Sequence, residues 1–280
     1  MRRVGAAVMN ASLVRSPASR FQEAAAPPGE AQLFAWRARA LYLGPALNLS
    51  AHRNAVAVLA LGLDRPFEVA DAPGDPASAW RACRSVLIPP DTLHHLKCGD
   101  GRMAFLYVDP LSRDLERLRA AARTPRPRAG FDVDVEPAFI NLLRPLAEGR
   151  QAWADVRPAL GRLLSGDEGP DDADPRVRDA LARLHANPAA RLPLASLAAE
   201  AALSPSRFRR LFRAATGVTV RRYRIWIAMG AAVRAISRGE PLTTAALDAG
   251  FSSSAHFSGA FREMFGLEPS RLARGRLALA

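Results

Sequence analysis

A segment near the carboxyl end of the chain returns in altered form 49 residues later, and this repeat constrains the fold more than any other feature. Each copy, Ser204–Gly217 and Ser253–Gly266, begins with a serine suited to cap a helix and ends at a glycine suited to terminate it. Between these ends, apolar residues recur at the i, i+3, i+4 and i+7 spacing of a helix with one buried face. They are Phe208, Leu211, Phe212 and Ala215 in the first copy, and Phe257, Ala260, Phe261 and Met264 in the second. The repeat therefore predicts two similar helices, at about residues 205–216 and 253–265.

A shorter helical pattern precedes each copy, at residues 194–201 and 243–249, and a tight turn follows it in both cases. A helix, a turn of three or four residues and a second helix form the unit that places its second helix in the DNA major groove. Two generic helical hairpins are the plain alternative. The outward positions of the first copy favour DNA, because they carry several arginines and no acidic residue.

The positive charge of the chain is concentrated in the same region. The net charge is +12, yet residues 1–175 hold 22 basic and 21 acidic side chains, whereas residues 176–280 hold 17 and 6. This asymmetry is expected where one domain meets a polyanion and the other does not. Charge alone leaves RNA, a membrane surface and simple solubility as competing explanations.

The segment from about Arg191 to Ala273 resembles the paired helix-turn-helix domain of AraC/XylS-type transcription regulators. The resemblance rests on residues 204–213, Thr216-Gly217, Tyr223, residues 249–252, Phe257, Phe261-Arg262 and residues 265–269. It implies an all-α carboxyl-terminal domain of two helix-turn-helix units, joined by a long helix at about Val220 to Ser237. Each unit would enter one of two adjacent major-groove segments on the same face of the duplex.

Carried over position by position, the resemblance implies base-reading residues Ser206, Arg209 and Arg210 in the first unit, and Ser254, Ala255 and Ser258 in the second. An arginine fork matches the two acceptors of guanine, at about 1–3 kcal/mol of discrimination per good pair. The second set is small and uncharged, so we expect an asymmetric reader in which the first unit supplies most direct readout. Phosphate contacts are expected from Arg207, Arg213, Arg221, Arg222 and Arg262.

The amino-terminal half has a different pattern. Residues 1–30 read as a loose arm, and residues 32–108 show short apolar runs divided by turn formers, which favours a β-sandwich or barrel. Helical spacing follows between residues 111 and 164, and residues 166–175 form an acidic Pro/Gly segment typical of a linker. The predicted fold is therefore α+β in two domains. A cupin-like effector and dimerisation domain would span residues 31–165, and an AraC-type DNA-binding domain residues 176–280.

Residues Val86–His95 and the next strand carry the resemblance to cupin-like sensor domains, but the metal ligands of true cupins are missing. His52 stands alone, and His94 and His95 are adjacent, so in a strand they would face opposite sides. No metal or cofactor is predicted. Five aromatic residues would line an effector cavity or simply form the core: Trp36, Tyr42, Phe67, Trp80 and Phe105. Two cysteines, Cys83 and Cys98, would be buried structural residues or a redox pair. The helices of residues 111–164 would form a dimer surface or cover the sheet.

Taken together, these features predict a sequence-specific, small-molecule-responsive transcription regulator that is not an enzyme. The family resemblance leans toward an activator, for which RNA polymerase would be a partner besides double-stranded DNA, an unknown effector and a second copy of the chain. The longest apolar stretch, Ala55–Leu63, is too short to span a bilayer, so a cytoplasmic protein without a membrane partner is expected. A cupin-type small-molecule enzyme and a non-specific architectural DNA binder are the alternatives.

Overall fold

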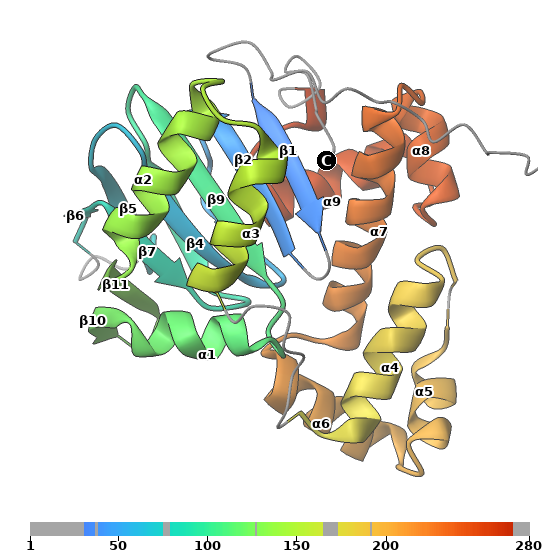
Figure 1. The fold of residues 1–280 in the computed structure, drawn as a ribbon. Coiled ribbons are helices and arrows are strands. Elements are labelled where there is room, and N and C mark those ends of the chain that lie inside the picture. Colours follow the sequence, from blue (N-terminus) through green and yellow to red (C-terminus); the bar gives the residue numbers. More distant parts are fainter. Residues whose placement is uncertain are drawn as a thin grey trace, which may run out of the picture.

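A computed structural model describes residues 31–36, 39–74, 79–126, 128–164, 173–190 and 192–270. The predicted arm at residues 1–30 and most of the predicted linker, residues 166–172, lie outside the described residues. Figure 1 shows an amino-terminal body of sheets and helices beside a carboxyl-terminal body made of helices alone. Among the described residues, no helix combines the length and the hydropathy that crossing a bilayer requires.

The amino-terminal strands form two antiparallel sheets within the described part of the chain. The strands are β1 (Gln32–Trp36), β2 (Arg39–Pro45), β3 (His52–Arg53), β4 (Ala57–Gly62), β5 (Phe67–Ala70), β6 (Arg81–Cys83), β7 (Ser85–Ile88), β8 (Leu93–Lys97), β9 (Arg102–Val108), β10 (Ala122–Arg126) and β11 (Ala129–Val133). One sheet has the order β1-β2-β9-β4-β7-β11-β10, and the other has the order β3-β8-β5-β6. The predicted sandwich is confirmed.

Both faces of the larger sheet are buried, and strand β4 shows how. Successive side chains of a strand point to opposite faces, so Val58 and Ala60 pack toward the second sheet. Leu59 and Leu61 pack instead into a cluster with three helices. These are α1 (Arg113–Ala120), α2 (Glu136–Ala147) and α3 (Trp153–Leu163). The helices of residues 111–164 cover the sheet (Figure 1), and their role as a dimer surface stays a prediction.

One element between residues 111 and 164 was not predicted from the helical spacing. Strands β10 and β11 form a hairpin between α1 and α2, and β11 extends the larger sheet by pairing with β7. The hairpin escapes sequence analysis because β10 carries Pro125 and two arginines and shows no alternation of apolar and polar residues. Its place depends on pairing with a distant strand.

The carboxyl-terminal body follows the predicted pattern closely. Its helices are α4 (Pro175–Ala186), α5 (Leu194–Glu200), α6 (Pro205–Thr216), α7 (Val220–Ser237), α8 (Leu242–Asp248) and α9 (Ser254–Phe265). We call α5–α6 the first unit and α8–α9 the second unit. Helix α7 is the predicted long connection and has the predicted bounds. Phe208 and Phe212 of the first unit pack on α4, α5 and α7 in a largely separate core.

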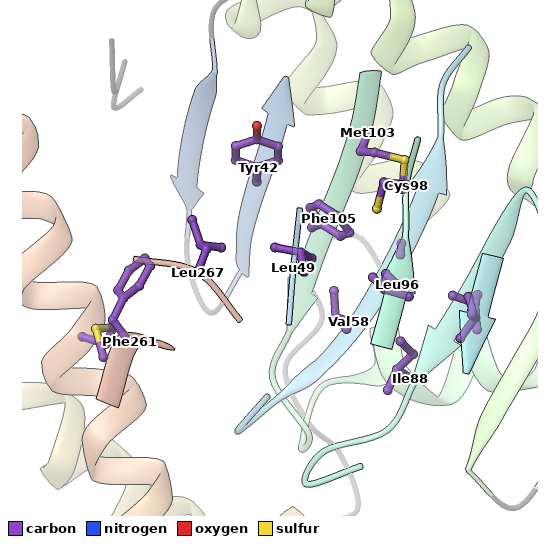
Figure 2. Packing of buried hydrophobic residues seen from close by; sticks show 14 of the residues in the cluster. Tyr42, Leu49, Val58, Ile88, Leu96, Cys98, Met103, Phe105, Phe261 and Leu267 are labelled. Atoms are coloured by element: carbon purple, nitrogen blue, oxygen red, sulfur yellow. The ribbon is translucent and has the colours of Figure 1, made fainter. Parts of the chain in front are cut away.

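The second unit has no such separate core. Phe257 and Phe261 belong to the same hydrophobic cluster as Tyr42 and Phe105 of the amino-terminal sandwich. Figure 2 shows Phe261 and Leu267 on one side of this cluster, across from Tyr42, Leu49 and Phe105. The two bodies are therefore joined through apolar packing at the second unit.

Candidate nucleic-acid interface

The two candidate reading helices, α6 and α9, begin and end alike. The Ser204 hydroxyl accepts a hydrogen bond from the Arg207 amide at 3.4 Å, and the Ser253 hydroxyl accepts one from the His256 amide at 3.0 Å. Each helix ends at a glycine in the left-handed region, with φ of +76° at Gly217 and +72° at Gly266. The repeat seen in the sequence is thus a repeat of helix boundaries.

The outer face of α6 is exposed and positively charged. Ser206, Arg207, Arg209, Arg210 and Arg213 are all exposed, while Phe208 and Phe212 on the opposite face are buried. None of these four arginines forms an ion pair with another described residue. The predicted base-reading arginines therefore stand together on one accessible face, free to meet an anionic partner.

The outer face of α9 is smaller and less charged. Ala255 is exposed, Ser254 and Ser258 are half-buried, and Arg262 is exposed but pairs with Glu268 at 3.1 Å. His256 is a polar residue on this face that sequence analysis passed over. Its Nδ1 accepts a hydrogen bond from the Ser252 amide at 3.4 Å, so in the neutral ring Nε2 carries the proton and presents a donor to solvent.

The predicted phosphate contacts on α7 separate into two kinds. Arg221 is exposed, as a phosphate contact requires. Arg222 instead has only 17% of its side chain exposed and lies between the two bodies. Its Nη1 pairs with Glu263 at 2.7 Å, and its Nε lies 3.5 Å from the Asp91 carboxylate. Arg224, a third arginine of α7, donates to the carbonyl oxygens of Ala190 and Leu192, which precede α5.

A cavity of about 180 Å³ lies between the two bodies. The amino-terminal wall is apolar and aromatic, and the opposite wall comes from α7 and α9 with the segment that follows α9. Lining residues include Leu33, Tyr42, Leu49 and Phe105 on the first wall, and Trp226, Met229, Val233, Phe261, Phe265 and Leu267 on the second. In Figure 2, Phe261 and Leu267 of the second wall lie across from Tyr42, Leu49 and Phe105 of the first.

Two arginines, an aspartate and a histidine also line this cavity: Arg39, Arg234, Asp109 and His185. Arg39 donates two hydrogen bonds to the Asp114 carboxylate, at 2.6 and 2.9 Å, so its charge is already balanced. Arg234 forms no ion pair with a described residue, and desolvation lowers the pKa of its guanidinium. The cavity thus has apolar walls and one lining cation, Arg234, that no described carboxylate pairs with.

Comparison with known proteins agrees with this geometry. A helix-turn-helix domain family matches residues 197–275, a range that holds most of the first unit, α7 and all of the second unit. The carboxyl-terminal domain is an AraC-type helix-turn-helix domain. No curated relative matches the sequence.

Solved structures extend the likeness beyond this AraC-type domain. ToxT from Vibrio cholerae O395 is 11% identical, with 85% of this chain and 97% of that chain covered and a TM-score of 0.54. Wild-type ToxT from V. cholerae strain SCE256, bound to an unsaturated fatty acid, is also 11% identical. The match covers 84% of this chain and 94% of that chain, with a TM-score of 0.54. An AraC-type DNA-binding domain from Chromobacterium violaceum is 24% identical over 36% of this chain and 92% of that chain, with a TM-score of 0.35. The ToxT likeness shows a shared fold across both bodies.

The histidines and cysteines of the amino-terminal body form no metal centre with other described residues. His52 and His94 are cross-strand neighbours with ring centroids 4.2 Å apart, whereas His95 faces Trp80. Cys83 and Cys98 are free and buried, and burial raises the pKa of each thiol to about 12. Both thiols therefore remain protonated near neutral pH, the less reactive form.

Of the five aromatic residues considered for a cavity, two line it and three do not. Tyr42 and Phe105 are lining residues, whereas Phe67 lies in the core between the sheets. Trp36 packs against Trp153, and Trp80 packs under the Lys97 ammonium. Sequence analysis missed Trp226, Phe265 and Arg234, because nothing in a helical pattern shows which domain a helix face will pack against.

Proposed function

We propose that this protein is a sequence-specific DNA-binding transcription regulator that reads two adjacent major-groove segments with α6 and α9. The observation that carries the proposal is the exposed, unpaired arginine face of α6 on an AraC-type domain. Arg209 and Arg210 would read bases, and Arg207, Arg213 and Arg221 would hold phosphates. We place the DNA-binding domain at residues 176–280 and the amino-terminal sensor domain at residues 31–165.

Selection from a random duplex library with the full-length chain tests this function. A regulator enriches one or a few sequences and binds them at least about 10³-fold more tightly than random duplex. Equal affinity for all duplexes would indicate an architectural DNA binder instead. Arg210→Ala should reduce affinity for the enriched site far more than affinity for random duplex.

We infer that the interdomain cavity holds the effector, and that the effector is an amphiphile with an apolar body and an anionic head. The apolar walls fit the body, and Arg234, the unbalanced cation, fits the head. The fold likeness to ToxT solved with an unsaturated fatty acid supports this class. An aliphatic monocarboxylate is the simplest molecule of this kind.

A matched pair of probes tests the head group. Dodecanoate should raise the melting temperature of the full-length protein more than dodecan-1-ol, which has the same chain and no charge. Arg234→Gln should remove that difference, whereas Arg238→Gln, a residue on the same helix end that pairs with Glu240, should keep it. Equal stabilisation by both probes would contradict an anionic effector. RNA polymerase and a second copy of the chain remain proposed partners.

A further inference from the structure

The sensor domain holds the corner that joins α6 to α7, residues 217–223, through contacts with three of its residues. Pro90 lies beside Gly217, where an added Cβ would stand 3.3 Å from the proline ring. Asp91 pairs with Arg222, and the Tyr223 hydroxyl donates a hydrogen bond to the Asp109 carboxylate. All three contacts come directly after the first reading helix, so they fix the first unit against the sensor domain.

Arg222 is the residue of this corner whose contacts conflict with DNA binding. Its Nη1 pairs with Glu263 at 2.7 Å, its Nη2 donates to the Arg53 carbonyl at 2.5 Å, and its Nε faces Asp91. The exposed arginines of α6 have no such partners among the described residues. With 17% of its side chain exposed and its charge facing two carboxylates, this guanidinium is shielded and already balanced, so it attracts a phosphate less than an open arginine does.

The turn that carries Asp91 is rigidly placed. Asp91 has φ of +59°, a left-handed conformation that few residues other than glycine adopt readily. Its amide donates to the Asn54 carbonyl at 2.9 Å, and its own carbonyl accepts from Arg53 Nη1 at 2.8 Å. The backbone N–H and C=O of Asp91 are therefore both hydrogen-bonded, and its carboxylate faces Arg222.

The second unit docks on the same domain without this conflict. Gly266 and Met264 offer only backbone carbonyls, which accept from the Ser50 amide at 2.8 Å and from Asn54 Nδ2 at 2.7 Å. No cation of α9 is taken up by a described residue of the sensor domain in this contact. Competition with DNA is thus confined to the corner beside the first unit.

We propose that the Pro90–Asp91 turn is an autoinhibitory contact that keeps Arg222 from DNA phosphate until the two domains separate. The inference rests on the proposed DNA-binding function and adds its regulation. Asp109, which holds Tyr223 in the same corner, also lines the interdomain cavity. A cavity occupant with different affinities for the joined and separated arrangements therefore shifts the population that exposes Arg222.

Asp91→Asn in the full-length chain is the test, because asparagine tolerates the left-handed conformation and removes the charge. Binding to one fixed random duplex and to the enriched site is measured by fluorescence anisotropy across a salt series. We expect affinity to rise about fivefold to tenfold at 0.1 M salt, and the log–log salt slope to steepen by about one unit, as one added phosphate contact gives. In an Arg222→Ala background the same change should alter neither quantity.

Asp71→Asn is the matched control, since Asp71 lies near Asp91 in the same polar surface pocket and does not pair with Arg222. It should leave affinity and slope unchanged. If Asp91→Asn lowers the melting temperature strongly, Glu263→Gln, which removes the other carboxylate partner, should give a smaller gain of the same sign. An unchanged or weaker affinity in both variants overturns the autoinhibitory contact. The proposed function fails separately, if wild type and variant both bind random and enriched duplexes equally.

Discussion

The reading helices of the first unit and the second unit both begin at a serine cap and end at a left-handed glycine. Their exposed faces nevertheless differ in charge and in side-chain size. Helix α6 exposes four arginines that form no ion pair within the described part of the chain, whereas α9 exposes Ala255, Gly259 and an arginine that pairs with Glu268. The units also differ in packing, because the first has a largely separate core and the second shares one with the sandwich. Boundary residues and buried phenylalanines therefore set the shape of a unit, while outward positions set its chemistry.

The largest expected effect is on folding stability, and it tests the buried phenylalanines that the two units have in common. Phe208→Ala and Phe257→Ala each remove a fully buried ring, which costs about 3–5 kcal/mol of folding free energy. Urea unfolding followed by circular dichroism measures the loss. Leu247→Ala, at a side chain that is 49% exposed, is the control and should change stability by less than about 0.5 kcal/mol. A small effect at either phenylalanine would break the equivalence of the two units.

Acid should lower the folding stability of the protein through His52 and His94, which lie where the second unit packs on the amino-terminal body. Burial lowers the pKa of His52 to about 4 and that of His94 to about 3, and the His52 ring lies against Gly266. An unfolded histidine takes up a proton near pH 6.5, whereas these folded rings do not until the pH is lower still. Their stabilising effect is therefore complete above pH 6.5 and falls as the pH drops toward 4.

Between pH 7 and pH 5 this loss should amount to about 2 kcal/mol for each histidine. Urea midpoints at pH 7.5, 6 and 5 measure it, and His94→Asn should flatten the dependence by about half. The buried Asp109 carboxyl, whose pKa is raised by desolvation, contributes to the pH dependence of stability with the opposite sign. A pH dependence that His94→Asn leaves unchanged would show that His94 is not held neutral in the folded protein.

The difference in readout should be smaller and visible only in DNA binding. Arg209→Ala should lower affinity for the enriched site by about 1–3 kcal/mol, because an arginine fork discriminates guanine at that level. Ser258→Ala should cost less than about threefold in affinity, since a hydroxyl makes a single weaker contact. Anisotropy titrations on the enriched and random duplexes compare them. The reverse ranking would overturn the asymmetric reader.

The two terminal glycines provide the finest comparison. Alanine at Gly217 or Gly266 must adopt a left-handed conformation, at about 1–2 kcal/mol each. Gly266→Ala should cost at least about 1 kcal/mol more, because its Cβ would stand 2.5 Å from the Ser50 carbonyl oxygen. At Gly217 the nearest atom is a proline carbon at 3.3 Å. Thermal unfolding of the two variants measures these losses of folding free energy. Equal losses would contradict the tighter docking of the second unit.

Local features of the sequence determined the carboxyl-terminal helices and the exposed arginines of the first unit. A cap, an apolar spacing and a terminating glycine act within a few residues of one another, so α6 and α7 have the predicted bounds. Only the tertiary structure decided the β10–β11 hairpin, the interdomain cavity and the ion pair between Arg222 and Asp91. These features join residues far apart in the chain, such as Tyr223 and Asp109 at a separation of 114 positions. Such contacts depend on how one domain packs on the other, and that packing leaves no periodic trace in either segment alone.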